Sequence, residues 1–153
     1  MSELRDLYQE VILDHNKHPH NFGELNGSDR HADGFNPLCG DKLVVYVNLD
    51  GDTITDVRFE GSGCAISQAS ASLMTDSVKG KTLVEARELF DRFLNLVTDE
   101  DAEDDARALG KLAVFAGVRD YPARVKCASL AWHTLRAAVE DRHDVVTLSL
   151  IHI

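Results

Sequence analysis

Residues 43–52 of this chain read Leu43-Val44-Val45-Tyr46-Val47-Asn48-Leu49-Asp50-Gly51-Asp52. The valine-rich part favours an extended strand, and the Asp-Gly-Asp sequence has the chemistry of a hairpin turn. After the turn, Val57 and Phe59 alternate with charged residues, which indicates a second strand with one buried and one exposed face. A third strand is expected at about 30–35. Together these segments predict a small antiparallel three-stranded sheet.

The rest of the chain shows helical patterns. Residues 1–15 carry apolar side chains at helical spacing, and the helix is expected to end near His15. Small and apolar residues over 65–74 predict a helix packed closely on the sheet. Thr82 and Glu85 form a capping-box pattern ahead of the next helix, and two more helices are expected at about 106–118 and from Pro122 to about Val139. Strands followed by a cluster of helices predict an α+β fold.

Length and charge limit the possible functions. The 153 residues suit one domain, expected over 1–148, with 149–153 as a tail or a short terminal strand. A formal charge of −10 argues against nucleic-acid binding and favours an electropositive protein partner. The acidic run at 99–105 is expected to be a solvated loop leading into a helix. No apolar run is long enough to span a membrane, and a cytoplasmic location is expected.

The chain has only three cysteines, and each stands at an expected element boundary. Cys39 and Asp41 flank Gly40 just before the first clear strand. Cys64 follows the second strand and opens a helix, and Cys127 is expected in the first turn of the last helix. Three thiolates and one carboxylate make a complete tetrahedral zinc shell. The spacing is not that of a zinc finger, so on spacing alone three buried, inert cysteines remain an equal alternative.

Glycines beside the cysteines and a group of histidines near the N-terminus also bear on a metal site. A side chain at Gly40 is expected to crowd the site, and the glycines before Cys64 are expected to let the backbone turn closely beside a metal. Residues His15, His18 and His20 are irregularly spaced around Pro19, which favours an exposed loop over a metal-binding segment.

Five segments carry a family resemblance, in the same order as in the family and over about residues 4–139. They are Leu7-Tyr8-Gln9-Glu10-Val11-Ile12-Leu13-Asp14-His15, Asn21-Phe22-Gly23, Asn36-Pro37-Leu38-Cys39-Gly40-Asp41, Gly61-Ser62-Gly63-Cys64-Ala65-Ile66-Ser67 and Arg124-Val125-Lys126-Cys127-Ala128. The chain resembles the SufU branch of the IscU/NifU-like proteins of iron–sulfur cluster assembly. Lys126 stands where the IscU branch has a histidine, and the segment between Cys64 and Cys127 is longer than in that branch. Both departures resemble SufU.

The resemblance implies an IscU-like fold and a zinc-dependent sulfurtransferase. In that reading a cysteine desulfurase of the SufS type passes persulfide sulfur to Cys39, which hands it on to a downstream iron–sulfur assembly scaffold. Zinc is then held by Cys39, Asp41, Cys64 and Cys127, and a histidine of the desulfurase replaces Cys39 on the metal. Arg124 is expected to act in catalysis or partner contact.

The sequence leaves two alternatives open. One is an IscU-type scaffold that builds an iron–sulfur cluster on the same cysteines and Asp41, because thiolates suit both zinc and clusters. The other is a binding module with a purely structural zinc.

Overall fold

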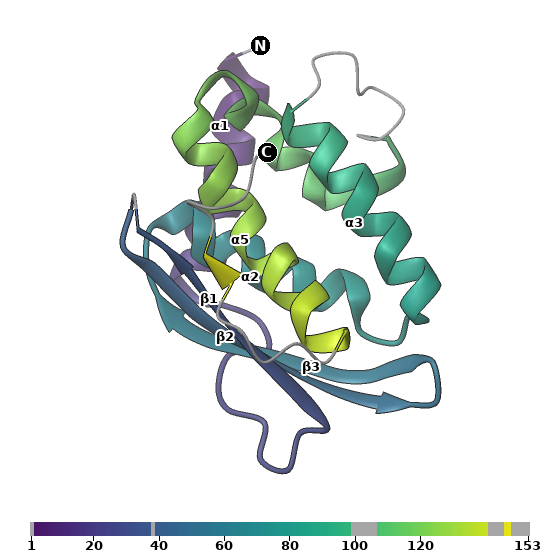
Figure 1. Ribbon diagram of the computed structural model, residues 1–153. Helices are drawn as coiled ribbons and strands as arrows, with labels where there is room; N and C mark the ends of the chain where they lie inside the picture. The colour runs from purple at the N-terminus through teal and green to yellow at the C-terminus, as the bar shows by residue number, and fades with distance from the viewer. Residues whose placement is uncertain (1, 38, 99–106, 141–145, 148–153) are drawn as a thin grey trace.

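The computed structural model describes residues 2–37, 39–98, 107–140 and 146–147. The strands are β1 (Arg30–Asn36), β2 (Asp41–Asp50), β3 (Thr53–Ser62) and β4 (Val146–Thr147). The helices are α1 (Ser2–Lys17), α2 (Ala65–Val78), α3 (Leu83–Thr98), the 3₁₀ helix η1 (Gly110–Asp120) and α5 (Pro122–Val139). Figure 1 shows these elements as a sheet below a group of helices. The α+β fold is therefore confirmed.

The sheet has the strand order β3-β2-β1-β4. Strands β1 and β2 pair antiparallel, and so do β2 and β3, which confirms the predicted three-stranded core of the sheet. Gly51 has a φ of +61° in the β2–β3 hairpin, a value that glycine adopts without steric cost. The short strand β4 adds a parallel pairing to β1, with Gly34 opposite Val146, and was not predicted.

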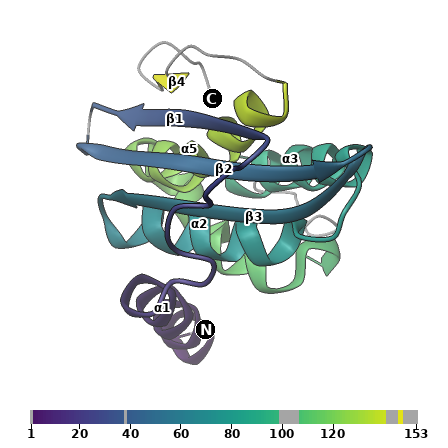
Figure 2. The same ribbon diagram turned by 90° about the horizontal axis from the view of Figure 1, so that it is seen from below.

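Helices α2 and α5 cover one face of the sheet, while the connection from α1 to β1 passes over the other face (Figure 2). Helix α5 packs on β1 and β2, and α2 packs on β3. The approach of α5 to β1 is close, because a Cβ added to Gly34 would lie 2.1 Å from Thr134 Oγ1. Fully buried aromatic side chains fill the space above the sheet, with Trp132 stacked on Phe93 at 4.8 Å between ring centroids.

The ends of the helices follow local sequence signals. Thr82 and Glu85 form the predicted capping box before α3: Glu85 N donates to Thr82 Oγ1 at 3.1 Å, and Thr82 N donates to Glu85 Oε1 at 3.0 Å. Helix α5 starts at Pro122, a residue whose fixed φ and missing N–H suit the first helical position. The helix predicted at about 106–118 is confirmed over the described residues, since 107–109 are α-helical and 110–120 form the 3₁₀ helix η1.

Two predictions concern residues outside the described ones: the acidic loop at 99–105 and the tail at 149–153. Within the described ranges, no helix is long and apolar enough to cross a membrane.

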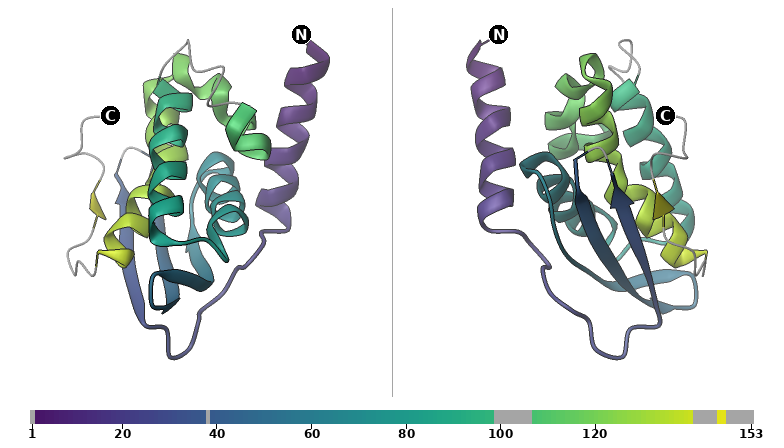
Figure 3. Two further views of the ribbon diagram at one scale, coloured as in Figure 1. Left: turned by 90° about the vertical axis from the view of Figure 1, so that its right-hand side faces the viewer. Right: turned by 60° about the vertical axis from the view of Figure 1, so that its left-hand side comes forward.

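Helix α1 lies at the edge of the molecule and packs against α2 (Figure 3). The segment after it pairs with the free edge of β3: Gly23 N donates to Phe59 O at 2.8 Å, and Phe59 N donates to Asn21 O at 3.1 Å. Asn21 makes this turn with a φ of +54°, a conformation that asparagine tolerates better than most residues. The pairing holds the start of this connection in place before the chain reaches β1.

Candidate metal centre

Three elements meet where the predicted site residues lie. The turn between β1 and β2 carries Cys39, the first residue of β2 is Asp41, and Cys64 caps the N-terminus of α2. Cys127 comes from α5, but the prediction that it lies in the first turn was wrong, because α5 starts at Pro122 and Cys127 falls in the second turn. All four side chains nevertheless gather at the same end of the sheet.

The distances define a compact group of donors. Cys127 Sγ lies 3.2 Å from Cys39 Sγ, and one donor atom from each of Cys39, Asp41 and Cys127 lies within 4.8 Å of the other two. Cys64 stands at the border of this group, with its Sγ 4.0 Å from Asp41 Oδ2. The structure therefore brings all four predicted residues together, three of them more tightly than the fourth.

Asp41 is fully buried, and its orientation is fixed by the start of α2. The backbone N–H of Cys64 donates to Asp41 Oδ1 at 2.8 Å. A Cβ added to Gly63 would lie only 2.4 Å from the same oxygen. A residue with a side chain therefore does not fit between the end of β3 and the Asp41 carboxylate. This is the close approach that the glycines before Cys64 predicted.

Gly40 is needed for a different reason from the one predicted. Its φ is +71°, which is in the left-handed region that favours glycine. A Cβ at this position would meet nothing within 4 Å, so the expectation that a side chain would crowd the site was wrong. The backbone conformation between Cys39 and Asp41, not lack of space, accounts for the glycine.

Asn36 is a site residue that sequence reasoning missed. It is fully buried, and its side-chain amide donates to Asp41 Oδ2 at 3.3 Å and lies 3.6 Å from Cys127 Sγ. Asn36 thus links Asp41 of β2 and Cys127 of α5 in one hydrogen-bond network. The only signal in the sequence was its place at the start of the segment that contains Cys39.

The side chains of Cys64 and Cys127 interact through a hydrogen bond. A hydrogen bond from Cys127 lowers the pKa of Cys64, and the backbone N–H of Ser67, 3.5 Å from the Cys64 Sγ, acts in the same direction. The same hydrogen bond, together with burial, raises the pKa of Cys127. Of the two thiols, Cys64 is therefore the one that ionises more readily.

Exposure differs among the three cysteines. Cys39 is exposed, Cys64 is half-buried and Cys127 is buried. Arg124 is also exposed, on the first turn of α5, and Lys126 is half-buried. The site therefore presents one sulfur to an approaching protein and keeps another inside the fold.

The donor set fits a thiophilic cation. Asp41 is a buried carboxylate, and among the described residues no lysine or arginine forms an ion pair with it. Burying an ionised group without a compensating charge is costly, and a bound cation removes that cost. Thiolates with one carboxylate suit zinc, and thiolates also suit iron in clusters.

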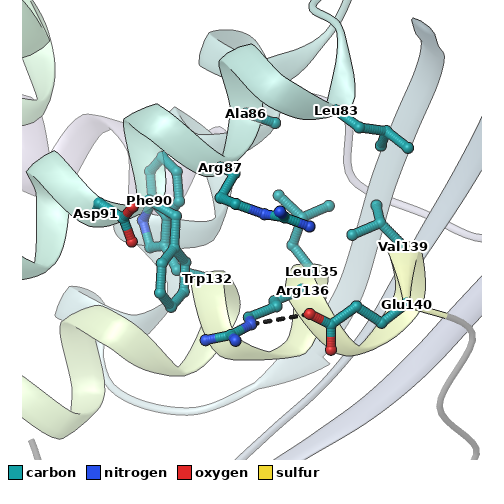
Figure 4. A pocket seen from close by; sticks show the side chains of 10 residues that line it. All are labelled: Leu83, Ala86, Arg87, Phe90, Asp91, Trp132, Leu135, Arg136, Val139 and Glu140. Atoms are coloured by element: carbon teal, nitrogen blue, oxygen red, sulfur yellow. Dashed lines mark hydrogen bonds and ion pairs between the residues drawn. The ribbon is translucent and has the colours of Figure 1, made fainter. Parts of the chain in front are cut away.

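A separate cavity of about 300 Å³ lies between α3 and the C-terminal half of α5 (Figure 4). Its lining includes Phe90 and Trp132, and Arg136 pairs there with Glu140 at 3.1 Å. None of the residues that line it is a cysteine or histidine. The candidate metal centre is thus not part of this cavity.

Residues 7–128 match the family model described as the NifU-like N terminal domain. The chain is 43% identical over 138 residues to a protein from Bacillus subtilis named zinc-dependent sulfurtransferase SufU, covering 90% of this chain and 92% of that one. It is 41% identical over 140 residues to a protein from Streptococcus pyogenes named iron-sulfur cluster assembly scaffold protein IscU, covering 92% and 87%.

Solved structures show the same fold. One is described as a putative iron-sulfur cluster assembly scaffold protein for the SUF system from Fervidobacterium islandicum, with a TM-score of 0.75 and 39% identity over 85% of this chain and 94% of that one. Another is a NifU-like protein from Brucella abortus, with a TM-score of 0.77 and 27% identity over 89% and 94%. The fold that the resemblance implied is therefore confirmed.

Proposed function

Because this chain belongs to the family of NifU-like N-terminal domains, proteins of iron–sulfur cluster assembly, we propose that it is a zinc-dependent sulfurtransferase. In this role it accepts persulfide sulfur on Cys39 from a cysteine desulfurase of the SufS type. The observation that carries the proposal is the position of Cys39, an exposed thiol whose sulfur lies within 4.8 Å of donor atoms of Asp41 and Cys127.

Zinc is assigned to Cys39, Asp41, Cys64 and Cys127. When bound, the ion supplies the positive charge that keeps these thiols deprotonated near neutral pH. Asn36 and the N–H of Cys64 orient the Asp41 carboxylate toward the donor group, so that it does not have to rearrange on metal binding. Cys127 and Asp41 anchor the site from inside the fold, and Cys39 is left at its outer edge.

The transfer step follows the rules of thiol–disulfide exchange. The Cys39 thiolate attacks the outer sulfur of the desulfurase persulfide, and a new S–S bond forms at Cys39. The original S–S bond breaks, and the desulfurase cysteine leaves as a thiolate. No external oxidant or reductant is needed, because the sulfur atom moves with its oxidation state unchanged.

The partner is proposed from charge as well as chemistry. A chain with a formal charge of −10 is attracted to an electropositive docking face, and Arg124 is exposed beside the site where it can contact the desulfurase. The sulfur passes from Cys39 to a downstream scaffold of iron–sulfur assembly. A reducing compartment, the cytoplasm, keeps the three thiols available.

The test is a cysteine desulfurase assay with and without this protein, together with zinc and acid-labile sulfide content of the purified protein. We call the group of Cys39, Asp41, Cys64 and Cys127 the thiolate site. We expect one equivalent of zinc at this site, no sulfide, and a gain in desulfurase turnover that Cys39→Ala abolishes. Ser62→Ala, an exposed change at the last residue of β3, is the matched control and should keep the gain. Stimulation that survived in Cys39→Ala would remove Cys39 from the acceptor role.

A second candidate function is an iron–sulfur scaffold. It is favoured by the 41% identity to a protein named as an IscU scaffold and by donors that suit cluster iron as well as zinc. Iron with equimolar sulfide on anaerobically purified protein, with little effect on desulfurase turnover, would support this function over the first.

A further inference from the structure

A second group of possible metal ligands lies at the opposite end of α2 from Cys64. It consists of His15 from the last turn of α1, His20 from the segment that follows, and Asp76 from the last turn of α2. One donor atom from each lies within 4.8 Å of the other two. The expectation that the histidines around Pro19 form an exposed loop was therefore wrong for His15, which is buried.

Each histidine of this group is fixed through a polar contact. His15 Nδ1 is hydrogen-bonded to Ser72 Oγ at 2.7 Å, and Nε2 is the ring nitrogen outside this hydrogen bond. The backbone N–H of His20 donates to the same Ser72 hydroxyl at 2.8 Å. The ring of His15 is thus held as in many metal-binding histidines, with one ring nitrogen on a protein group, whereas the contact of His20 fixes its backbone.

The carboxylate is oriented in a similar manner. The side-chain amide of Asn21 donates to Asp76 Oδ1 at 3.1 Å, and it also donates to Thr75 Oγ1 at 3.0 Å. Asp76 Oδ2 then faces His20 Nδ1 at 2.5 Å. One oxygen is thus tied to a neighbouring side chain while the other points to the histidine.

The group is closed on one side and open on the other. His15 is 6% exposed, whereas the side chains of His20 and Asp76 are 48% and 42% exposed. Ligands about 2.1 Å from a tetrahedral ion lie about 3.4 Å apart, so the His20–Asp76 pair has to open by about 1 Å. Two exposed side chains can make that movement, and the open side leaves room for water as a further ligand.

This group is separate from the thiolate site. Cys64 caps the N-terminus of α2 and Asp76 lies near its C-terminus, about 18 Å away at 1.5 Å per residue. The two groups share no residue, so an ion at one does not have to compete with an ion at the other.

From this geometry we propose that His15, His20 and Asp76 form a second, sulfur-free site for a divalent first-row transition ion. Two imidazoles and one carboxylate suit Zn²⁺ and Fe²⁺, unlike the oxygen-only sites that Mg²⁺ and Ca²⁺ prefer. The ion joins α1, the segment after it and α2. The inference does not depend on the sulfurtransferase proposal, because it uses none of the residues of the thiolate site.

The experiment counts bound Co²⁺ and Zn²⁺ on the full, reduced chain after metal removal. Wild-type protein is expected to bind two equivalents of Co²⁺, of which only one gives sulfur-to-metal charge-transfer absorption. His20→Ala and Asp76→Asn change exposed side chains, and each should lower the affinity for the second equivalent at least tenfold while the sulfur-ligated equivalent is retained. His18→Ala, an exposed histidine of the same segment outside the group, is the matched control and should retain both.

Zn²⁺ beyond the first equivalent should also raise the melting temperature of the wild type and of His18→Ala, but not of His20→Ala, because a ligand that binds only the folded state stabilises it. Absence from the wild type of any bound equivalent other than the sulfur-ligated one would overturn the proposal. Retention of both equivalents by His20→Ala and Asp76→Asn would do so as well.

Discussion

Gly63→Ala tests the construction of the thiolate site with a single methyl group. The added Cβ would lie 2.4 Å from Asp41 Oδ1 and 3.0 Å from its Cβ and Cγ. Non-bonded heavy atoms are at their best separation at about 3.5 Å, so the carboxylate oxygen has to retreat by about 1 Å. That movement also stretches the 2.8 Å hydrogen bond from Cys64 N beyond hydrogen-bond length.

The expected magnitude follows from two effects. Overpacking of this kind costs about 1–3 kcal/mol of folding free energy, which lowers the melting temperature by about 2–10 °C in a domain of this size. Metal–ligand distances tolerate only about 0.2 Å, so the displaced Asp41 no longer ligates and zinc affinity falls by about 10–100-fold. Zinc affinity is measured by competition with a chromogenic chelator, and stability by thermal unfolding of the metal-free protein.

Gly51→Ala is the control. Gly51 also has a positive φ, but an added Cβ meets nothing within 4 Å and lies in the hairpin turn at the other end of β2. This variant should lose a little stability and keep its zinc affinity. If Gly63→Ala bound zinc as tightly as Gly51→Ala, the argument that Gly63 makes room for a ligating Asp41 would fail.

Three further predictions concern the same fold and site. Asp41→Asn should lower zinc retention during dialysis against a chelator more than the matched change Asp33→Asn on the exposed surface of β1, and equal retention would exclude Asp41 as a ligand. Gly34→Ala should destabilise by about 1–3 kcal/mol because its Cβ would meet Thr134 Oγ1, and Thr134→Ala in the same chain should recover part of that loss in a double-mutant cycle of thermal unfolding. The backbone N–H of Thr82 lowers the pKa of Glu85, so the Glu85 carboxylate stabilises the fold above the ordinary glutamate pKa and loses this effect as the pH falls through the lowered pKa. The difference in melting temperature between wild type and Glu85→Ala should therefore shrink from pH 7 to pH 3. An unchanged difference would contradict this.

Local signals in the sequence predicted the fold well. The turn at Gly51 predicted the hairpin, and the capping box of Thr82 and Glu85 predicted the start of α3. Both signals act between residues a few positions apart, which is why one sequence is enough to find them. The two-residue strand β4 escaped prediction, because so short a strand has no periodicity and is defined only by its pairing with β1.

The residues of the candidate site could be proposed from the sequence where they lie in recognisable segments. Contacts between residues far apart in the sequence could not. The resemblance identified Cys39, Asp41, Cys64 and Cys127, and the structure brings them together. The role of Asn36 depends on a contact with Cys127, 91 residues further along the chain. The group of His15, His20 and Asp76 depends on the packing of α1 against α2, which no local pattern indicates.

The order of the thiolate donors along the chain has a consequence for unfolding. Cys39 and Cys127 are 88 residues apart in sequence and 3.2 Å apart in space. An ion held by both acts as a removable cross-link that closes a loop over more than half of the chain, and closing such a loop in the unfolded chain is entropically costly. The turn before β2, the start of α2 and the start of α5 then have to separate in one event. A metal bound by both cysteines would thereby slow unfolding as well as govern the chemistry of the sulfur.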